Sequence, residues 1–237
     1  MTKISGLRLY VINMTRIITA IENQKKDPQR VNIYLDEEFA FGMAGFLAAW
    51  LQVGQELNEE KIESLISEDL LESTVQKALH FMNFRPRSTS EIRKNLANKD
   101  IPESVIEETI DRLQKNSILD DQRFAQNWIE NRTAFRPRSR SALRMELRLK
   151  GVPDDVIQTA LEDIDDEALA FQAAQKYLRR LEGLNKLEFR KKLISHLARR
   201  GFSFASINPV VTRVWNEIQP TSNHGASINN EDNSWKL

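Results

Sequence analysis

The pentapeptide Phe84-Arg85-Pro86-Arg87-Ser88 decides the fold, because the chain contains it again, 51 residues later, as Phe135-Arg136-Pro137-Arg138-Ser139. The same shift holds without a gap as far as Leu113. A weaker third copy follows at a shift of 50, where Lys150-Gly151-Val152 becomes Arg200-Gly201-Phe202. Repeats of this length are typical of stacked modules whose common surface is built by repetition. Function is therefore expected on an extended surface rather than in a pocket.

The composition excludes several classes of protein. Of the 237 residues, 41% are hydrophobic and 29% are charged, as in a globular chain, and no segment approaches the ~20 apolar residues of a membrane-spanning helix. The N-terminus lacks the apolar core and cleavage site of a signal peptide, and no cysteine is present for a disulfide or a thiol site. We therefore expect a cytoplasmic protein without membrane contact. The 34 basic and 34 acidic residues balance overall, but the two signs are separated along the chain.

Strand patterns occur only near the N-terminus. Residues 15–21, 31–35 and 39–42 are rich in β-branched or aromatic side chains and are separated by polar turns, which predicts a three-stranded antiparallel unit. Because three short strands bury little surface alone, this unit should pack on the helices predicted at 58–68 and 71–83.

Each repeat has the pattern of three short helices. Ser88 and Glu91 predict a capping box at the start of one helix of the first repeat. In the second repeat, Gly151 suits the end of one helix and Pro153 the first turn of the next. The first helix of the third repeat is predicted over 166–182.

The predicted fold is thus mainly α, with three tandem three-helix repeats in an elongated, curved array and a small N-terminal antiparallel β unit. The predicted segments are an N-terminal extension at 1–14, the β unit with its connecting helices at 15–70, repeats 1, 2 and 3 at 71–118, 119–164 and 165–218, and a disordered tail at 219–237. The tail is predicted because apolar residues are scarce near the C-terminus.

Three stretches resemble the signatures of RecX, a bacterial family that regulates the RecA recombinase. They are Arg85–Arg93, Leu119–Ala125 and Leu147–Val152, and the run Leu119–Ala125 between two copies of the RPRS motif is a specific signal. The predicted strands also resemble an N-terminal extension found in some members. Two positions depart from the family pattern, because Asp100 stands where glycine is common and Ser139-Arg140 where Gly-Pro is common.

The resemblance implies a monomeric, non-catalytic regulator that binds the RecA nucleoprotein filament. Such a protein lies along the helical groove of the filament and damps ATP hydrolysis and strand exchange. This activity belongs to homologous recombination, DNA repair and the SOS response. Independently, the chain has no GxxxxGK[ST], GxSxG or HExxH motif, so we expect no enzyme activity, cofactor or metal.

Basic side chains recur at equivalent places in the repeats. Arg140, Arg144 and Arg148 are spaced i, i+4, i+8 and are expected to form a stripe on one helix face. Like charges at this spacing repel by about 0.2–0.5 kcal/mol per pair, which favours neutralisation by an acidic partner. The predicted partner-binding residues are Arg85, Arg87, Arg93, Arg132, Arg136, Arg138, Arg140, Arg144, Arg148, Lys150, Arg190, Lys191, Arg199 and Arg200.

The nature of the partner stays open on charge alone. Arginine favours bidentate contacts with either carboxylate or phosphate, so an acidic protein groove and a DNA backbone are both compatible with the pattern. The alternative function is a helical-repeat module that binds single- or double-stranded DNA directly, without RecA. A third interpretation is a plain helical adaptor whose arginine stripe is only a solvated face.

Other conspicuous residues favour structural roles. Phe84 and Phe135 could stack on a base, but we expect them to cover the junctions between repeats. Phe124 and Trp128, at i and i+4, should lie in the core. The pair Asp120-Asp121 is expected to open a helix, where acidic side chains meet the positive end of the helix dipole, rather than to bind a metal.

Overall fold

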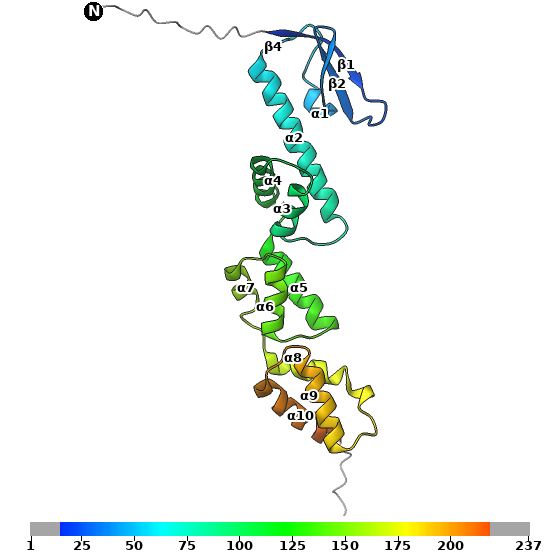
Figure 1. Ribbon diagram of the computed structural model, residues 1–237, viewed down its shortest axis with the longest axis vertical. Helices are drawn as coiled ribbons and strands as arrows, with labels where there is room; N and C mark the ends of the chain where they lie inside the picture. The colour runs from blue at the N-terminus through cyan, green and yellow to red at the C-terminus, as the bar shows by residue number, and fades with distance from the viewer. Residues whose placement is uncertain (1–14, 219–237) are drawn as a thin grey trace, which may run out of the picture. The chain divides into compact units, whose positions relative to one another are not determined.

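The computed structural model describes residues 15–218, and the predicted N-terminal extension and C-terminal tail lie outside this range. The described chain is mainly helical with a small antiparallel sheet near its N-terminus, as the sequence predicts (Figure 1). It divides into two compact units, Met1–Asp120 and Asp121–Leu237. Among the described helices, none combines the length and the apolar character that crossing a bilayer requires.

The sheet of the first unit has four strands in the order β3-β2-β1-β4. The three predicted strands are present, and the unpredicted β4 consists of two residues, too few to show an alternating pattern. Asp36 and Glu37 form the hairpin turn between β2 and β3 with φ values of +53° and +70°, as a two-residue turn of this kind requires. The strands are β1 (Arg16–Asn23), β2 (Arg30–Leu35), β3 (Glu38–Ala44) and β4 (Glu56–Leu57), and the short helix α1 (Gly45–Ala48) follows β3.

One long helix, α2 (Glu59–Met82), replaces the two helices predicted at 58–68 and 71–83. No glycine or proline interrupts this stretch, so the hydrogen-bonded ladder continues through the polar residues at the expected break. Leu65 belongs to the core under the sheet, whereas Val75 and Ala78 belong to the core of the first repeat. The helix is therefore shared by two hydrophobic cores, and the predicted packing of the β unit on a helix is confirmed.

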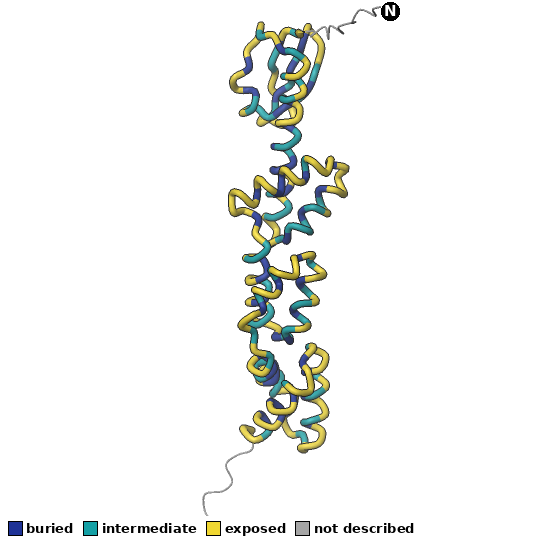
Figure 2. Tube along the Cα trace, turned by 90° about the vertical axis from the view of Figure 1, so that its left-hand side faces the viewer, coloured by how far each residue is buried: buried dark blue, intermediate teal, exposed yellow. Residues whose placement is uncertain are grey.

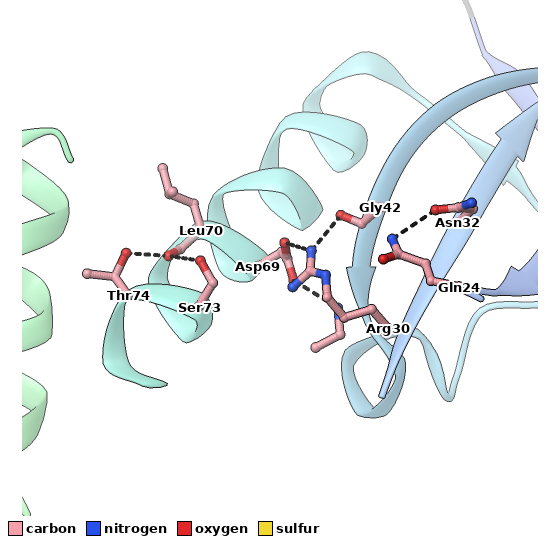
Figure 3. Close-up of polar contacts among 9 residues, drawn as sticks. Gln24, Arg30, Asn32, Gly42, Asp69, Leu70, Ser73 and Thr74 are labelled. Atoms are coloured by element: carbon pink, nitrogen blue, oxygen red, sulfur yellow. Dashed lines mark hydrogen bonds and ion pairs between the residues drawn. The ribbon is translucent and has the colours of Figure 1, made fainter. Parts of the chain in front are cut away.

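A part-buried ion pair fastens the sheet to α2 (Figure 3). The Asp69 carboxylate lies 2.7 Å from Arg30 Nη2 through Oδ2, and its Oδ1 accepts from the Ala44 backbone N–H at 2.8 Å. Arg30 Nη2 also donates to the Gly42 carbonyl at 3.2 Å. The Asp69 side chain is only 12% exposed, so its charge depends on these donors for compensation.

Removal of the Asp69 carboxylate should loosen the sheet from the helix. We expect Asp69→Ala to lower the opening free energy of the β2–β3 amides by about 2 kcal/mol, because Arg30 and the Ala44 N–H lose their acceptor. Hydrogen exchange of the full chain measures this change. Glu68→Ala is the matched control, since the exposed Glu68 carboxylate accepts only from Ser64 among the hydrogen bonds seen here. Equal protection in the two variants would contradict the assignment.

The first repeat is completed by α3 (Thr89–Ala97) and α4 (Glu103–Lys115). The predicted capping box is confirmed, because Ser88 accepts from the Glu91 N–H while the Glu91 carboxylate accepts from the Ser88 N–H. Asp100 follows α3 with a left-handed φ of +56°. Short polar residues such as aspartate tolerate this region, so the turn that commonly uses glycine keeps its backbone geometry here.

The second unit contains repeats 2 and 3 around one continuous core. Buried positions recur along each of its helices between exposed ones (Figure 2). Phe124 is buried and Trp128 packs partly buried against the same core, as predicted. Its helices are α5 (Asp121–Phe135), α6 (Arg140–Leu149), α7 (Asp154–Ala160), α8 (Asp166–Gln175), α9 (Lys186–Ala198) and α10 (Phe204–Ile218), with a 3₁₀ turn η1 (Leu178–Arg180).

The first helix of repeat 3 is shorter than the predicted 166–182. It ends at Gln175, and the chain then turns so that Tyr177 stacks on His196 and Leu181 enters the core at 3% exposure. Packing therefore overrides a helical pattern that the local sequence would continue.

Repeats 2 and 3 meet at a close backbone approach. Gly201 has a φ of +88°, and a Cβ at this position would lie 2.7 Å from Ser139 Oγ and 2.9 Å from Ala142 Cβ. The Ser139 N–H donates to the Arg200 carbonyl at 3.1 Å, and the Arg140 N–H donates to Asp166 Oδ1 at 2.5 Å. The predicted helix stop at Gly201 is thus also the contact that seats one repeat on the other.

A comparison of two glycines should separate backbone strain from this contact. Gly183→Ala, with a φ of +74° and nothing near the new Cβ, should cost roughly 1 kcal/mol of unfolding free energy from the left-handed backbone alone. Gly201→Ala should cost about 1–3 kcal/mol more, because Ser139 and Ala142 must also move. Urea denaturation of the full chain, followed by circular dichroism, measures both. Equal losses would show that Gly201 serves only as a helix stop.

Candidate partner-binding surface

The predicted partner-binding residues fall on both units. Arg85, Arg87 and Arg93 belong to the first unit, and the others belong to the second. Within each unit, the structure shows which positive charges already have a carboxylate partner and which do not. This distinction separates residues that hold the fold together from residues whose charge is available to another molecule.

In repeat 1 the arginines are used internally. Arg85 Nη2 lies 2.8 Å from Glu91 Oε1, which belongs to the capping box. Arg93 joins α3 to α4, because its Nη1 lies 2.7 Å from Glu103 Oε1 and its Nη2 donates to Glu107 at 3.0 Å. Arg87 lies over the Phe81 ring at 3.7 Å. Arg85 and Arg93 are therefore neutralised within this repeat, whereas Arg87 has a ring contact but no ion pair to a described carboxylate.

In repeat 2 a single carboxylate gathers three donors. Glu146 on α6 accepts from Trp128 Nε1 at 2.8 Å and from Arg132 Nε at 2.7 Å, both on α5. Its other oxygen lies 3.0 Å from Arg138 Nε in the RPRS turn, and the Glu146 side chain is 15% exposed. Lys150 also lies near the Trp128 ring, at 5.2 Å from its centre. Arg132 and Arg138 are therefore both held by Glu146, whose single negative charge balances one of the two cations.

The same position of the repeat carries a different polar residue each time. By the repeat register, Glu146 corresponds to Asn95 in the first repeat and to His196 in the third. The buried Asn95 Oδ1 has no hydrogen-bond partner within the protein. His196 stacks on the Tyr177 ring at 3.8 Å and accepts a hydrogen bond from Arg200 Nε at 2.9 Å. This position of the second helix thus makes polar contacts within the module in repeats 2 and 3, by a carboxylate in one and an imidazole in the other.

His196 acts as a neutral acceptor. Burial, followed by the positive charges of Arg200, Arg199 and Arg180, lowers its pKa to about 4. Arg200 in turn donates through Nη1 to the Pro137 carbonyl at 3.0 Å, which links repeat 3 to the RPRS turn of repeat 2. Arg200 was predicted to bind a partner, but its guanidinium is engaged in the junction between repeats.

The depressed pKa predicts a stability that depends on pH. The unfolded chain binds a proton at His196 near pH 6.5, whereas the folded chain does so only near pH 4. The contribution of His196 is therefore complete above pH 6.5 and is lost as the pH falls towards 4. We expect His196→Gln, which keeps an acceptor for Arg200, to show a smaller fall in unfolding free energy between pH 7 and about 4.5. Parallel urea titrations test this, and equal falls would contradict it.

The three arginines of the predicted stripe, Arg140, Arg144 and Arg148, differ in their surroundings and are not all available to a partner. Arg148 Nε lies 2.7 Å from Asp154 Oδ1, and this pairing raises the pKa of Arg148 and lowers that of Asp154. Arg140 Nε is buried without a hydrogen-bond partner. Arg144 forms no ion pair with a described carboxylate, although its charge also helps to lower the pKa of Asp154. The packing of α7 against α6 therefore engages Arg148 of the stripe in an ion pair within the protein.

The remaining predicted cations gather on the second unit. Arg136, Arg190, Lys191 and Arg199 join Arg144 in having no ion pair to a carboxylate of the described chain. A hollow of about 450 Å³ lies along α9, a feature that the sequence did not predict. It is lined by Tyr177, Glu188, Lys191, Lys192, Ser195 and Arg199.

Exposed apolar side chains accompany these cations. Phe84 and Phe135 are 72% and 73% exposed, so the prediction that they cover junctions is wrong. They follow or end α2 and α5 at positions outside the core-facing stripes of those helices. Met145 and Leu149 are also exposed, at i and i+4 on α6. Their spacing was visible in the sequence, but only packing shows that this side of α6 is uncovered.

The potential metal-binding residues do not assemble into a site. Across residues 15–218 no group of three histidine or acidic side chains is placed to hold a metal ion. Asp121 lies in the first turn of α5, so the predicted helix start there is confirmed. Its acidic side chain therefore has the position favoured by the helix dipole.

Comparison with known proteins gives a consistent result for the sheet and for each of the three repeats. Family models match for the "Regulatory protein RecX N-terminal domain" at 16–58 and for the first, second and third RecX three-helix domains at 75–113, 120–161 and 165–211. "Regulatory protein RecX" of Bacillus licheniformis is 34% identical over 81% of this chain and 74% of its own length. The Bacillus subtilis protein of the same name is 33% identical over 83% and 76%.

Two solved structures share the fold. A crystal structure of regulatory protein RecX aligns with a TM-score of 0.65 at 27% identity, covering 82% of this chain and 98% of that one. RecX from Lactobacillus salivarius aligns with a TM-score of 0.56 at 20% identity, covering 63% of this chain and 99% of that one. The second likeness bears on the fold alone.

Proposed function

Because this chain belongs to the RecX family of regulatory proteins, we propose that it regulates the RecA recombinase without catalysing a reaction itself. It binds the RecA–DNA filament along its groove and damps ATP hydrolysis and strand exchange during recombination and DNA repair. The observation that carries this proposal is the set of unpaired cations on the second unit, Arg136, Arg144, Arg190, Lys191 and Arg199.

These cations give the surface a preference for an anionic partner. A cation without an internal carboxylate gains a full Coulombic contact on binding, whereas a paired arginine must first give up an existing one. Arg136 and Arg144 can form planar, bidentate contacts with carboxylates. The binding should weaken as salt rises, because Arg136, Lys191 and Arg199 are exposed and the other two are only partly buried.

The exposed apolar residues favour a protein as the main partner. Phe135, Met145 and Leu149 lie on α5 and α6. Arg136 lies between these two helices, and Arg144 is part of α6. Aromatic side chains, methionine and arginine together are the composition of protein interface cores. A surface for the nucleic-acid backbone alone would gain little from exposing methionine and leucine.

A charge-matched pair of variants tests the proposal. The triple variant Arg136→Ala/Arg144→Ala/Arg190→Ala removes three unpaired cations. We expect it to need at least about tenfold more protein for half-maximal inhibition of RecA ATP hydrolysis on single-stranded DNA, which corresponds to about 1.4 kcal/mol of binding. The control is Arg85→Ala/Arg93→Ala/Arg148→Ala, which removes the same net charge from internally paired positions.

The control triple should shift inhibition by less than about threefold, because exposed paired arginines contribute little to an external contact. Equal effects would show that net charge, rather than pairing, governs binding. Unchanged hydrolysis and strand exchange with saturating wild-type protein would overturn the regulatory proposal.

Direct DNA binding is the second candidate function, and the same cations favour it. Fluorescence anisotropy with labelled DNA in the absence of RecA distinguishes the two. Tight binding with a steep salt dependence would favour the DNA-binding module, whereas weak binding alongside strong inhibition of RecA would favour the filament partner.

A further inference from the structure

The hollow along α9 has an ordered pattern of charge. Glu188, Lys191, Ser195 and Arg199 follow one another at three- or four-residue spacing and so share one side of the helix, with Lys192 beside Lys191. The stretch from Glu188 to Arg199 covers about 16 Å at 1.5 Å per residue. A negative end is thus followed by a positive centre and a positive far end.

The groups in this hollow are available to a ligand. Lys191, Lys192 and Glu188 form no ion pair with a described residue, and Arg199 uses one guanidinium nitrogen to donate to Ser195 Oγ at 2.6 Å. The charge pattern is particular to repeat 3, because Glu188, Lys191 and Arg199 correspond to Arg138, Ser141 and Leu149 in repeat 2 at a shift of 50 residues.

The lone carboxylate argues against a chain of phosphates. A polyanion running the length of the hollow would place a negative charge beside Glu188, and such like-charge contacts act against the wrong partner. A polypeptide can instead present a basic side chain to Glu188 and acidic side chains further along.

We propose that the α9 hollow binds an acidic segment of a protein partner, with a basic side chain of that segment at Glu188 and carboxylates at Lys191, Lys192 and Arg199. This rests on the proposed function in so far as the partner segment belongs to the RecA filament. The inference also fixes the orientation of the bound segment, because the charge pattern along α9 is not symmetrical. A segment that binds the α9 hollow in the reverse orientation, or shifted along it, places like charges against each other.

A charge exchange tests the pattern without changing the net charge. The double variant Glu188→Lys/Lys191→Glu exchanges the first two charges of the pattern and leaves Lys192 and Arg199 in place. Both side chains are exposed, so the fold should tolerate the exchange. We expect it to bind RecA–poly(dT) filaments at least about tenfold more weakly than wild type, as measured by anisotropy of the labelled full chain. Binding equal to wild type would overturn the inference. The exchange Glu22→Lys/Lys25→Glu, on exposed side chains with the same spacing of three residues, serves as the matched control and should keep wild-type affinity.

The single variant Glu188→Lys tests whether the ligand places a positive or a negative charge beside residue 188. A partner with a basic side chain at this point predicts weaker filament binding, by roughly threefold. A phosphate chain in the hollow predicts stronger binding to filaments and to poly(dT) alone, and that result would overturn the inference.

A second probe keeps the inference separate from the proposed function. It is an alanine-based helical peptide with Lys at i and Glu at i+4 and i+11, titrated into the isotope-labelled full chain. We expect shift changes at Glu188–Arg199 in wild type, and none in the exchange variant. The peptide with Glu at i, Lys at i+4 and Glu at i+11 should bind the exchange variant instead, because Arg199 is unchanged in that variant. If wild type fails to bind filaments but shows this peptide selectivity, only the RecA proposal fails. If it binds filaments but responds equally to both peptides, only the hollow inference fails.

Discussion

Three short helices bury too little apolar surface to be stable alone, so each module of this chain shares either a core or a helix with a neighbour. Repeats 2 and 3 form one continuous core. Repeat 1 obtains its first helix from α2, whose other end packs under the sheet. The polar joints follow from this arrangement, because modules that share a core must meet at defined places. Asp69 holds the sheet on α2, and Gly201 allows repeat 3 to approach the start of α6.

Within each module, the packing of helices around a shared core also determines which arginines form ion pairs. Helices packed around a small core bring the end of one helix near the side chains of the next, so cations and carboxylates separated in sequence become partners. Arg93 pairs with Glu103, and Arg132 with Glu146. Where no carboxylate is supplied, as along α9, the charge stays available to another molecule. The division between structural and partner-facing cations is therefore a consequence of packing.

The local chemistry of helix ends was predictable from the sequence. The Ser88–Glu91 capping box and the stop at Gly201 depend on residues close together in the chain, and both are present. Predictions that depended on distant residues were less successful. The helix predicted over 166–182 ends early because Tyr177 meets His196, and Phe84 and Phe135 are exposed because the core-facing sides of their helices lie elsewhere.

The sequence by itself determined the number of modules, the ends of most helices and membership of the RecX family. Each of these depends on the identity and spacing of residues that are close together in the chain. It also located the basic regions. Only the tertiary structure decided which of those basic side chains are already neutralised and that a hollow of mixed charge lies along α9. Ion pairing falls off steeply with distance, and the distance between Arg148 and Asp154 or between Arg138 and Glu146 is set by how the helices pack, not by their separation along the chain.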